Sequence, residues 1–107
     1  MAVYSKLLAA RVVAGGSDAL VYTAPALGTV VVRDVVVCAT TTTGTDVSLY
    51  GTSPGGVSTT IWHASVAGTG ATLHYDCRVV LEPGERLYVY APSGTVQVRI
   101  SGYLLGG

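Results

Sequence analysis

Valine dominates one ten-residue run of this chain, TVVVRDVVVC at Thr29–Cys38. β-Branched side chains favour strands over helices, so the run is predicted to be a strand. Strand alternation divides it into one face with Val30, Val32, Asp34, Val36 and Cys38 and another with Val31, Arg33, Val35 and Val37. Because both faces are mostly apolar, the second face is expected to be covered by a loop, a bulge or another subunit.

Seven further segments have strand character, and none has a helical period. They are Leu7–Val13, Ala19–Thr23, Val47–Tyr50, Thr59–His63, Thr72–Leu81, Arg86–Ala91 and Thr95–Ser101. Gly-rich or Pro-rich segments separate them: a hairpin loop at 14–18, an exposed loop at 51–56, a connection at 64–70 and a type II turn at 82–85. This spacing predicts one all-β domain over residues 1–107, an antiparallel β-sandwich of about eight strands that resembles a jelly roll.

Composition narrows the class of partner. The chain is 50% hydrophobic, only 11% charged, and has a formal net charge of zero. It therefore has no basic cluster to neutralise phosphates, and nucleic acid is excluded as an expected partner. No apolar run is long enough to span a membrane, and residues 1–13 do not form a signal peptide, so synthesis in a cytoplasm is expected. So little charge suits a chain that is built into a particle.

Candidate catalytic groups are few. His63 or His74 could pair with Asp46 or Asp76 as a general base, but His74 and Asp76 share a strand face and are interpreted as a surface contact. No nucleophile elbow and no phosphate-binding loop accompany them. We therefore expect no enzyme activity, no cofactor and no metal site, including at the turn that carries two glutamates.

The two cysteines, Cys38 and Cys77, lack metal-ligand spacing. They are interpreted as buried thiols, and a cross-strand disulfide is left open. Trp62, the one tryptophan, is expected to pack in the core.

Several apolar side chains are candidates for an interface. Tyr88 and Tyr90 alternate with Leu87 and Val89, so if the latter two are buried, the tyrosines stand on the outer face. The other candidate interface residues are Val31, Val35, Val37, Tyr103, Leu104 and Leu105. The two ends, at 1–8 and 103–107, are possible docking arms, although the second could instead complete a sheet.

Two segments, VYTAPALGTVVVRDVVVCAT at 21–40 and LEPGERLYVYAPSGTVQVRISGYLL at 81–105, resemble small virion accessory proteins of tailed bacteriophages. Leu27 stands where such sequences often have glycine, and Gly28 follows one position later. The absence of Asn and Phe and the near absence of Lys point to a G/C-rich coding sequence, which suits such a phage with a G/C-rich genome.

The resemblance implies a non-enzymatic β-sandwich that is a structural subunit of the virion, either a minor tail protein or a capsid decoration protein. Its partners would be other virion proteins and copies of itself. The alternative is a module that binds glycan on the host surface, with the loops at 40–46 and 51–56 beside exposed aromatic side chains.

Overall fold

The computed structural model describes residues 6–14, 16–26, 28–40, 45–66, 68, 71–92 and 94–105. Within these ranges the chain forms strands and turns and no helix, and so has no helix that could span a membrane. The strands are β1 (Lys6–Ala14), β2 (Ser17–Thr23), β3 (Thr29–Ala39), β4 (Thr45–Thr52), β5 (Ser58–Val66), β6 (Thr72–Leu81), β7 (Arg86–Ala91) and β8 (Thr95–Leu105).

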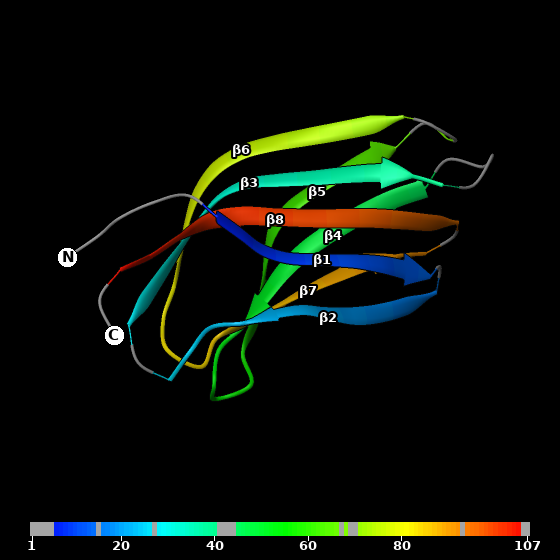
Figure 1. The fold of residues 1–107 in the computed structure, drawn as a ribbon. Helices are drawn as coiled ribbons and strands as arrows, with labels where there is room; N and C mark the ends of the chain where they lie inside the picture. Colours follow the sequence, from blue (N-terminus) through cyan, green and yellow to red (C-terminus); the bar gives the residue numbers. More distant parts are fainter. Residues whose placement is uncertain are drawn as a thin grey trace.

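These strands form two antiparallel sheets that pack face to face (Figure 1). The first sheet has the order β1-β8-β3-β6 and the second has the order β2-β7-β4-β5. All pairs are antiparallel, and the chain crosses between the sheets at every connection except the one from β4 to β5. This is the strand order of a jelly roll, so the predicted fold class is confirmed.

Several strands are longer than predicted, and the hairpin predicted at residues 14–18 is absent. Residues 14–18 do not close a hairpin, because β1 and β2 belong to different sheets. The strand predicted at Val47–Tyr50 continues through Gly51 and Thr52, which pair with β5 and β7. β5 continues to Val66, and β8 continues to Leu105. In these three extended strands, cross-strand pairing continues through residues that are small or near the end of the chain. Such residues gave only a weak strand signal in the sequence.

A β-bulge at Arg33 organises the first sheet. Val32 pairs with Gly102 of β8, whereas Asp34 pairs with Ser101, so Arg33 is an extra residue on β3. On the other side of β3 the register with β6 also shifts at this point. An extra residue reverses the alternation of side chains on the strand beyond it.

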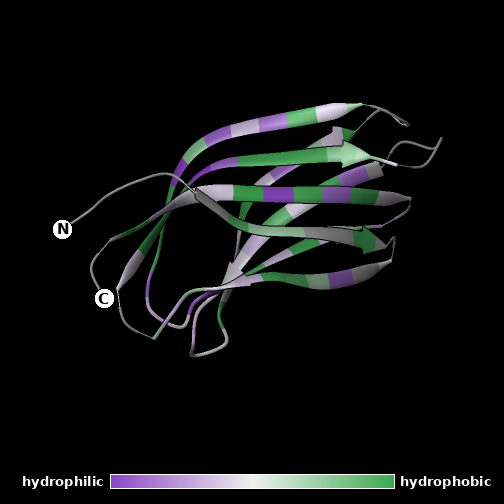
Figure 2. Ribbon diagram, in the orientation of Figure 1, coloured by the Kyte–Doolittle hydropathy of each residue, from purple (hydrophilic) through white to green (hydrophobic). Residues whose placement is uncertain are grey.

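The bulge corrects the predicted division of the valine run. Val30 and Val32 face the core before the bulge, and Val35, Val37 and Ala39 face it afterwards, each at most 2% exposed. Val36 now points to the outer face, where its cross-strand neighbours are His74 of β6 and Arg99 of β8. Figure 2 shows the resulting contrast, since β3 is largely hydrophobic where β6 and β8 alternate. Of the three explanations expected for the two apolar faces, a loop, a bulge or another subunit, the structure shows the bulge.

The core between the sheets is built mostly of valine and leucine. Its largest fully buried side chains include Leu49, Leu81, Leu87 and Ile100. Where β5 and β6 lie at the edges of their sheets, Trp62 stacks on Tyr75 with ring centroids 5.0 Å apart and planes 4° apart. Both rings are partly buried against the core, as expected for Trp62. The stack closes one edge of the sandwich with large apolar area.

Val35→Asp is expected to destabilise the protein by about 3–5 kcal/mol, because it places an unpaired carboxylate in the core. Val35 is 0% exposed, whereas Gln97 on the outer face of β8 is exposed. Gln97→Asp is therefore the control, with little expected change in urea denaturation. Equal tolerance of the two substitutions would contradict the assigned faces.

Gly102→Ala is expected to cost about 3 kcal/mol in the free energy of unfolding, through overpacking at the bulge. A Cβ at Gly102 would overlap the carbonyl oxygen of Val31 and lie 3.0 Å from the Cα of Val32. Gly55 is the control, because a Cβ there would meet nothing closer than the Ser53 hydroxyl at 3.8 Å. Thermal melts of both variants measure the difference, and an unchanged midpoint for Gly102→Ala would exclude the close approach of β3 and β8.

Candidate functional site

The outer face of the second sheet carries a group of aromatic side chains. Leu87 and Val89 of β7 are at most 1% exposed, so Tyr88 and Tyr90 point outward, as the alternation predicted. β4 adds Tyr50 directly opposite Tyr88, and β2 adds Leu20 on the other side of Tyr88. We call these four residues, Leu20, Tyr50, Tyr88 and Tyr90, the tyrosine face.

The centre of the tyrosine face is a stacked pair. The rings of Tyr50 and Tyr88 have centroids 5.3 Å apart and planes 10° apart. Desolvation and a hydrogen bond to the Asp18 carboxylate raise the pKa of Tyr50 to about 12. The phenol therefore stays neutral and donates to Asp18 across the intervening strand. The stacking and this hydrogen bond fix the orientations of the two rings.

The sequence alone did not single out Tyr50 or Leu20 as part of this face. Tyr50 stands in a segment that read as a short strand, and only the pairing of β4 with β7 brings it beside Tyr88. Alternation did place Tyr50 opposite Val47 and Leu49, which was the available signal. Alternation does not reveal the order of the strands in the sheet, and this order decides that Tyr50 lies beside Tyr88.

Tyrosine titration tests this arrangement. In a spectrophotometric pH titration, we expect Tyr50 to ionise near pH 12 rather than near its ordinary value of 10. The folded-state pKa is the higher one, so the resulting stability is present below pH 10 and is lost as the pH rises toward 12. Tyr50→Phe should remove the late-ionising group, and Asp18→Asn should lower its pKa. Tyr103→Phe, on the other sheet, is the control. A curve unchanged by Tyr50→Phe would contradict the assignment.

The other predicted interface residues are placed differently. Val35 and Val37 lie in the core because of the bulge, so we withdraw them as interface residues. Val31 is on the outer face but is 5% exposed, between Val80 of β6 and Tyr103 of β8.

Residues 103–105 belong to β8 and pair with β3, so this part of the predicted arm completes a sheet, and residues 106–107 lie outside the described residues. Leu104 packs against the core. At the opposite end of the chain, residues 1–5 of the proposed arm lie outside the described residues. Most of the predicted loop at 40–46 also lies outside the described residues. The segment Pro54–Val57 is exposed, as predicted for the loop at 51–56.

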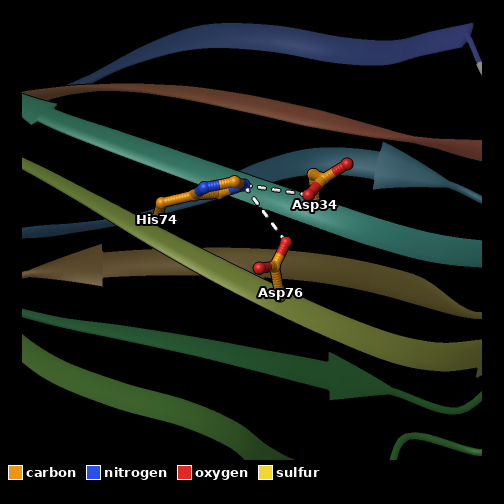
Figure 3. A group of neighbouring side chains, drawn as sticks. All are labelled: Asp34, His74 and Asp76. Atoms are coloured by element: carbon orange, nitrogen blue, oxygen red, sulfur yellow. Dashed lines mark hydrogen bonds and ion pairs between the residues drawn. The ribbon is translucent and has the colours of Figure 1, made fainter.

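The outer face of the first sheet gathers charged side chains around its bulge. Its charged face consists of Asp34, His74, Asp76, Arg78 and Arg99, from β3, β6 and β8. The bulge turns Asp34 to this face, directly opposite Asp76. His74 is two residues from Asp76 on β6, so the three side chains converge above the sheet (Figure 3).

Within this cluster His74 bridges the two carboxylates. Its Nε2 lies 2.8 Å from Oδ1 of Asp34 and 3.4 Å from Oδ1 of Asp76. The hydrogen bond from His74 holds the pKa of the Asp34 carboxyl below its ordinary value, and the contact with Asp76 adds to this effect. His74 and Asp76 therefore form the surface contact expected from the sequence. Asp34 is the member that the sequence analysis missed, because the bulge brings it there.

The second histidine, His63, lies on the outer face of the second sheet. Its Nδ1 is 2.8 Å from the Ser48 hydroxyl, and the Asp46 carboxylate accepts a hydrogen bond of 2.5 Å from the Ser65 hydroxyl. These contacts link β4 to β5 as cross-strand polar pairs.

The cysteines are both free. Cys77 faces the core and its thiol donates to the carbonyl of Val32, while Cys38 is half-buried on the outer face and pairs in register with Thr72. Thr72 is five residues, about 16 Å, from Cys77 along β6. Disulfide geometry requires Cα atoms within about 7 Å, so these two residues do not bridge within one chain.

Comparison with known proteins identifies the fold and no family. No protein-family model and no curated protein matches the sequence. Among solved structures, the chain is similar to a subunit of Bacillus endospore appendages described as a novel family of disulfide-linked pili. The TM-score is 0.55 and the identity 15%, over 97% of this chain and 89% of that chain. A chain of infectious bursal disease virus Gx strain gives a TM-score of 0.48 and 15% identity, over 98% of this chain and 38% of that chain.

Proposed function

We propose that this chain is a non-enzymatic structural subunit of a bacteriophage virion, located on the tail as a minor tail protein or on the capsid as a decoration protein. In this proposal the tyrosine face is the surface by which one copy docks on another. The observation that carries it is the contrast between the outer faces of the two sheets. Interface centres are enriched in tyrosine and depleted of most charged residues, and the tyrosine face matches that composition.

Three features support this choice of surface. Leu20 is 38% exposed beside the tyrosines, which leaves apolar area in contact with water. The Tyr50 ring is held by Asp18 and stacks on Tyr88, so little side-chain entropy is lost when a partner covers the two rings. The charged face of the first sheet, by comparison, consists of arginines, carboxylates and a histidine, which interact well with water.

The class of function is supported by two further observations. Residues 21–40 and 81–105 resemble virion accessory proteins of tailed phages, and in the fold these segments provide β3, β7 and β8 with their turns. The endospore appendage subunit, whose fold is similar, is a protein that assembles into pili. A jelly-roll sandwich with an aromatic outer face suits such repeated assembly.

Light scattering with tag-free protein over a concentration series tests the docking surface. We expect the wild type to self-associate. The dissociation constant of the double variant Tyr88→Ala, Tyr90→Ala should rise at least about tenfold, because the loss of aromatic anchor residues is costly at an interface. The matched control is Arg99→Ala with Gln97→Ala, on the outer face of the first sheet, which should leave association unchanged. Circular dichroism checks that both variants fold.

Two results would overturn the proposal. One is a wild type that stays monomeric at every concentration and does not bind isolated tails or capsids. The other is loss of association in the control variant alone, which would move the interface to the first sheet. If association is intact in the tyrosine variant while binding on a glycan array is abolished, the stacked rings beside a carboxylate form a sugar platform instead.

A further inference from the structure

The Asp34, His74 and Asp76 cluster has no part in the proposed docking surface. It lies on the outer side of the first sheet, and its side chains are exposed by 39%, 53% and 84% respectively. Asp34 and Asp76 are direct cross-strand partners, and like charges at such positions destabilise a sheet. A divalent cation held between the two carboxylates would offset this repulsion, and His74 lies in contact with both.

The donor atoms have the spacing of a metal site. Nε2 of His74 is 2.8 Å and 3.4 Å from the two carboxylate oxygens, and all three ligand atoms lie within 4.8 Å of one another. Bonds of about 2.1 Å to a tetrahedral ion place neighbouring donors about 3.4 Å apart. Small rotations of exposed side chains would therefore bring these three atoms around one ion, with water in the remaining positions.

The backbone under the cluster is paired on both sides of the bulge. All three residues stand on paired strands, in adjacent rows of one sheet, rather than on loops. Donors on strands are held more precisely than donors on loops, which lowers the cost of assembling the site. Arg33 is close enough to affect the pKa of Asp34, and Arg78 and Arg99 stand on the same outer face, so the site depends on direct coordination by its three donor atoms rather than on a net negative charge.

We propose that Asp34, His74 and Asp76 bind one divalent transition-metal ion, with Zn²⁺ as the probe, on the outer face of the first sheet. Neutral imidazole is a ligand for Zn²⁺ and its neighbours in the series, whereas Ca²⁺ and Mg²⁺ prefer sites made wholly of oxygen. The ion takes the place of the Nε2 proton between the carboxylates. Bound there, it fastens the edge strand β6 to β3 beside the bulge. This proposal does not depend on the proposed function.

Isothermal titration of tag-free, chelator-treated protein with ZnCl₂ is the test, in a buffer that keeps the thiols reduced. We expect saturable binding of one Zn²⁺ per chain and much weaker binding of Ca²⁺ or Mg²⁺. His74→Ala should weaken the Kd for Zn²⁺ by at least about tenfold, as loss of a ligand commonly does. Asp76→Asn should act in the same direction.

His63→Ala is the matched control, because it removes the other histidine of the chain. It should leave the Kd for Zn²⁺ unchanged, and so should Cys38→Ser, which removes a thiol from the same outer face. A second readout is the broadening of amide resonances by Mn²⁺, expected at Asp34, His74 and Asp76. The proposal fails if no saturable Zn²⁺ binding occurs, if His63→Ala weakens it as much as His74→Ala, or if broadening centres elsewhere. Light scattering of His74→Ala separates this failure from that of the docking surface, because association should be unaffected.

Discussion

The extra residue at Arg33 in β3 is the constraint on which the rest of this structure depends. β3 is an inner strand of the first sheet, so a single insertion in it affects its pairing with both β8 and β6. Beyond that point every side chain of β3 changes face. The bulge is accommodated only because Gly102 lets the two backbones approach, at a place where any Cβ would overlap the Val31 carbonyl.

This reversal of side-chain alternation in β3 decides which of its residues lie in the core and which lie on the outer face. It places Val35 and Val37 between the sheets, where they complete a core of valine and leucine. It also turns Asp34 outward, to the row that holds Asp76. Without the bulge, Asp34 would face the same side as Val30 and Val32, which are both buried. A carboxylate there would carry a large desolvation cost.

The two outer faces then take on different physical characters. On the second sheet, pairing of β7 with β2 and β4 gathers rings and a leucine into one apolar area. On the first sheet, pairing of β3 with β8 and β6 gathers charged side chains around Val36. Long polar side chains cover apolar neighbours on that face while their charged ends reach water. Four of the twelve Lys, Arg, Asp and Glu residues of the chain stand on this face: Asp34, Asp76, Arg78 and Arg99.

Local chemistry in the sequence determined the elements of this fold. β-Branched content identified the strands, alternation identified Tyr88 and Tyr90 as outward-facing, and the Pro-Gly pair predicted the turn at 82–85, where Gly84 has a φ of 79° and the amide of Glu85 donates to the carbonyl of Glu82. These features depend on residues close in the chain. The bulge, the partner of Tyr50 and the meeting of Asp34 with His74 depend on pairing between strands that are far apart in the chain. The hydrogen bond between Asp34 and His74 joins residues 40 positions apart, and the pair Val32–Gly102 at the bulge joins residues 70 positions apart. Only the tertiary structure decided them, because register is fixed by the summed packing of both sheets and not by any one segment.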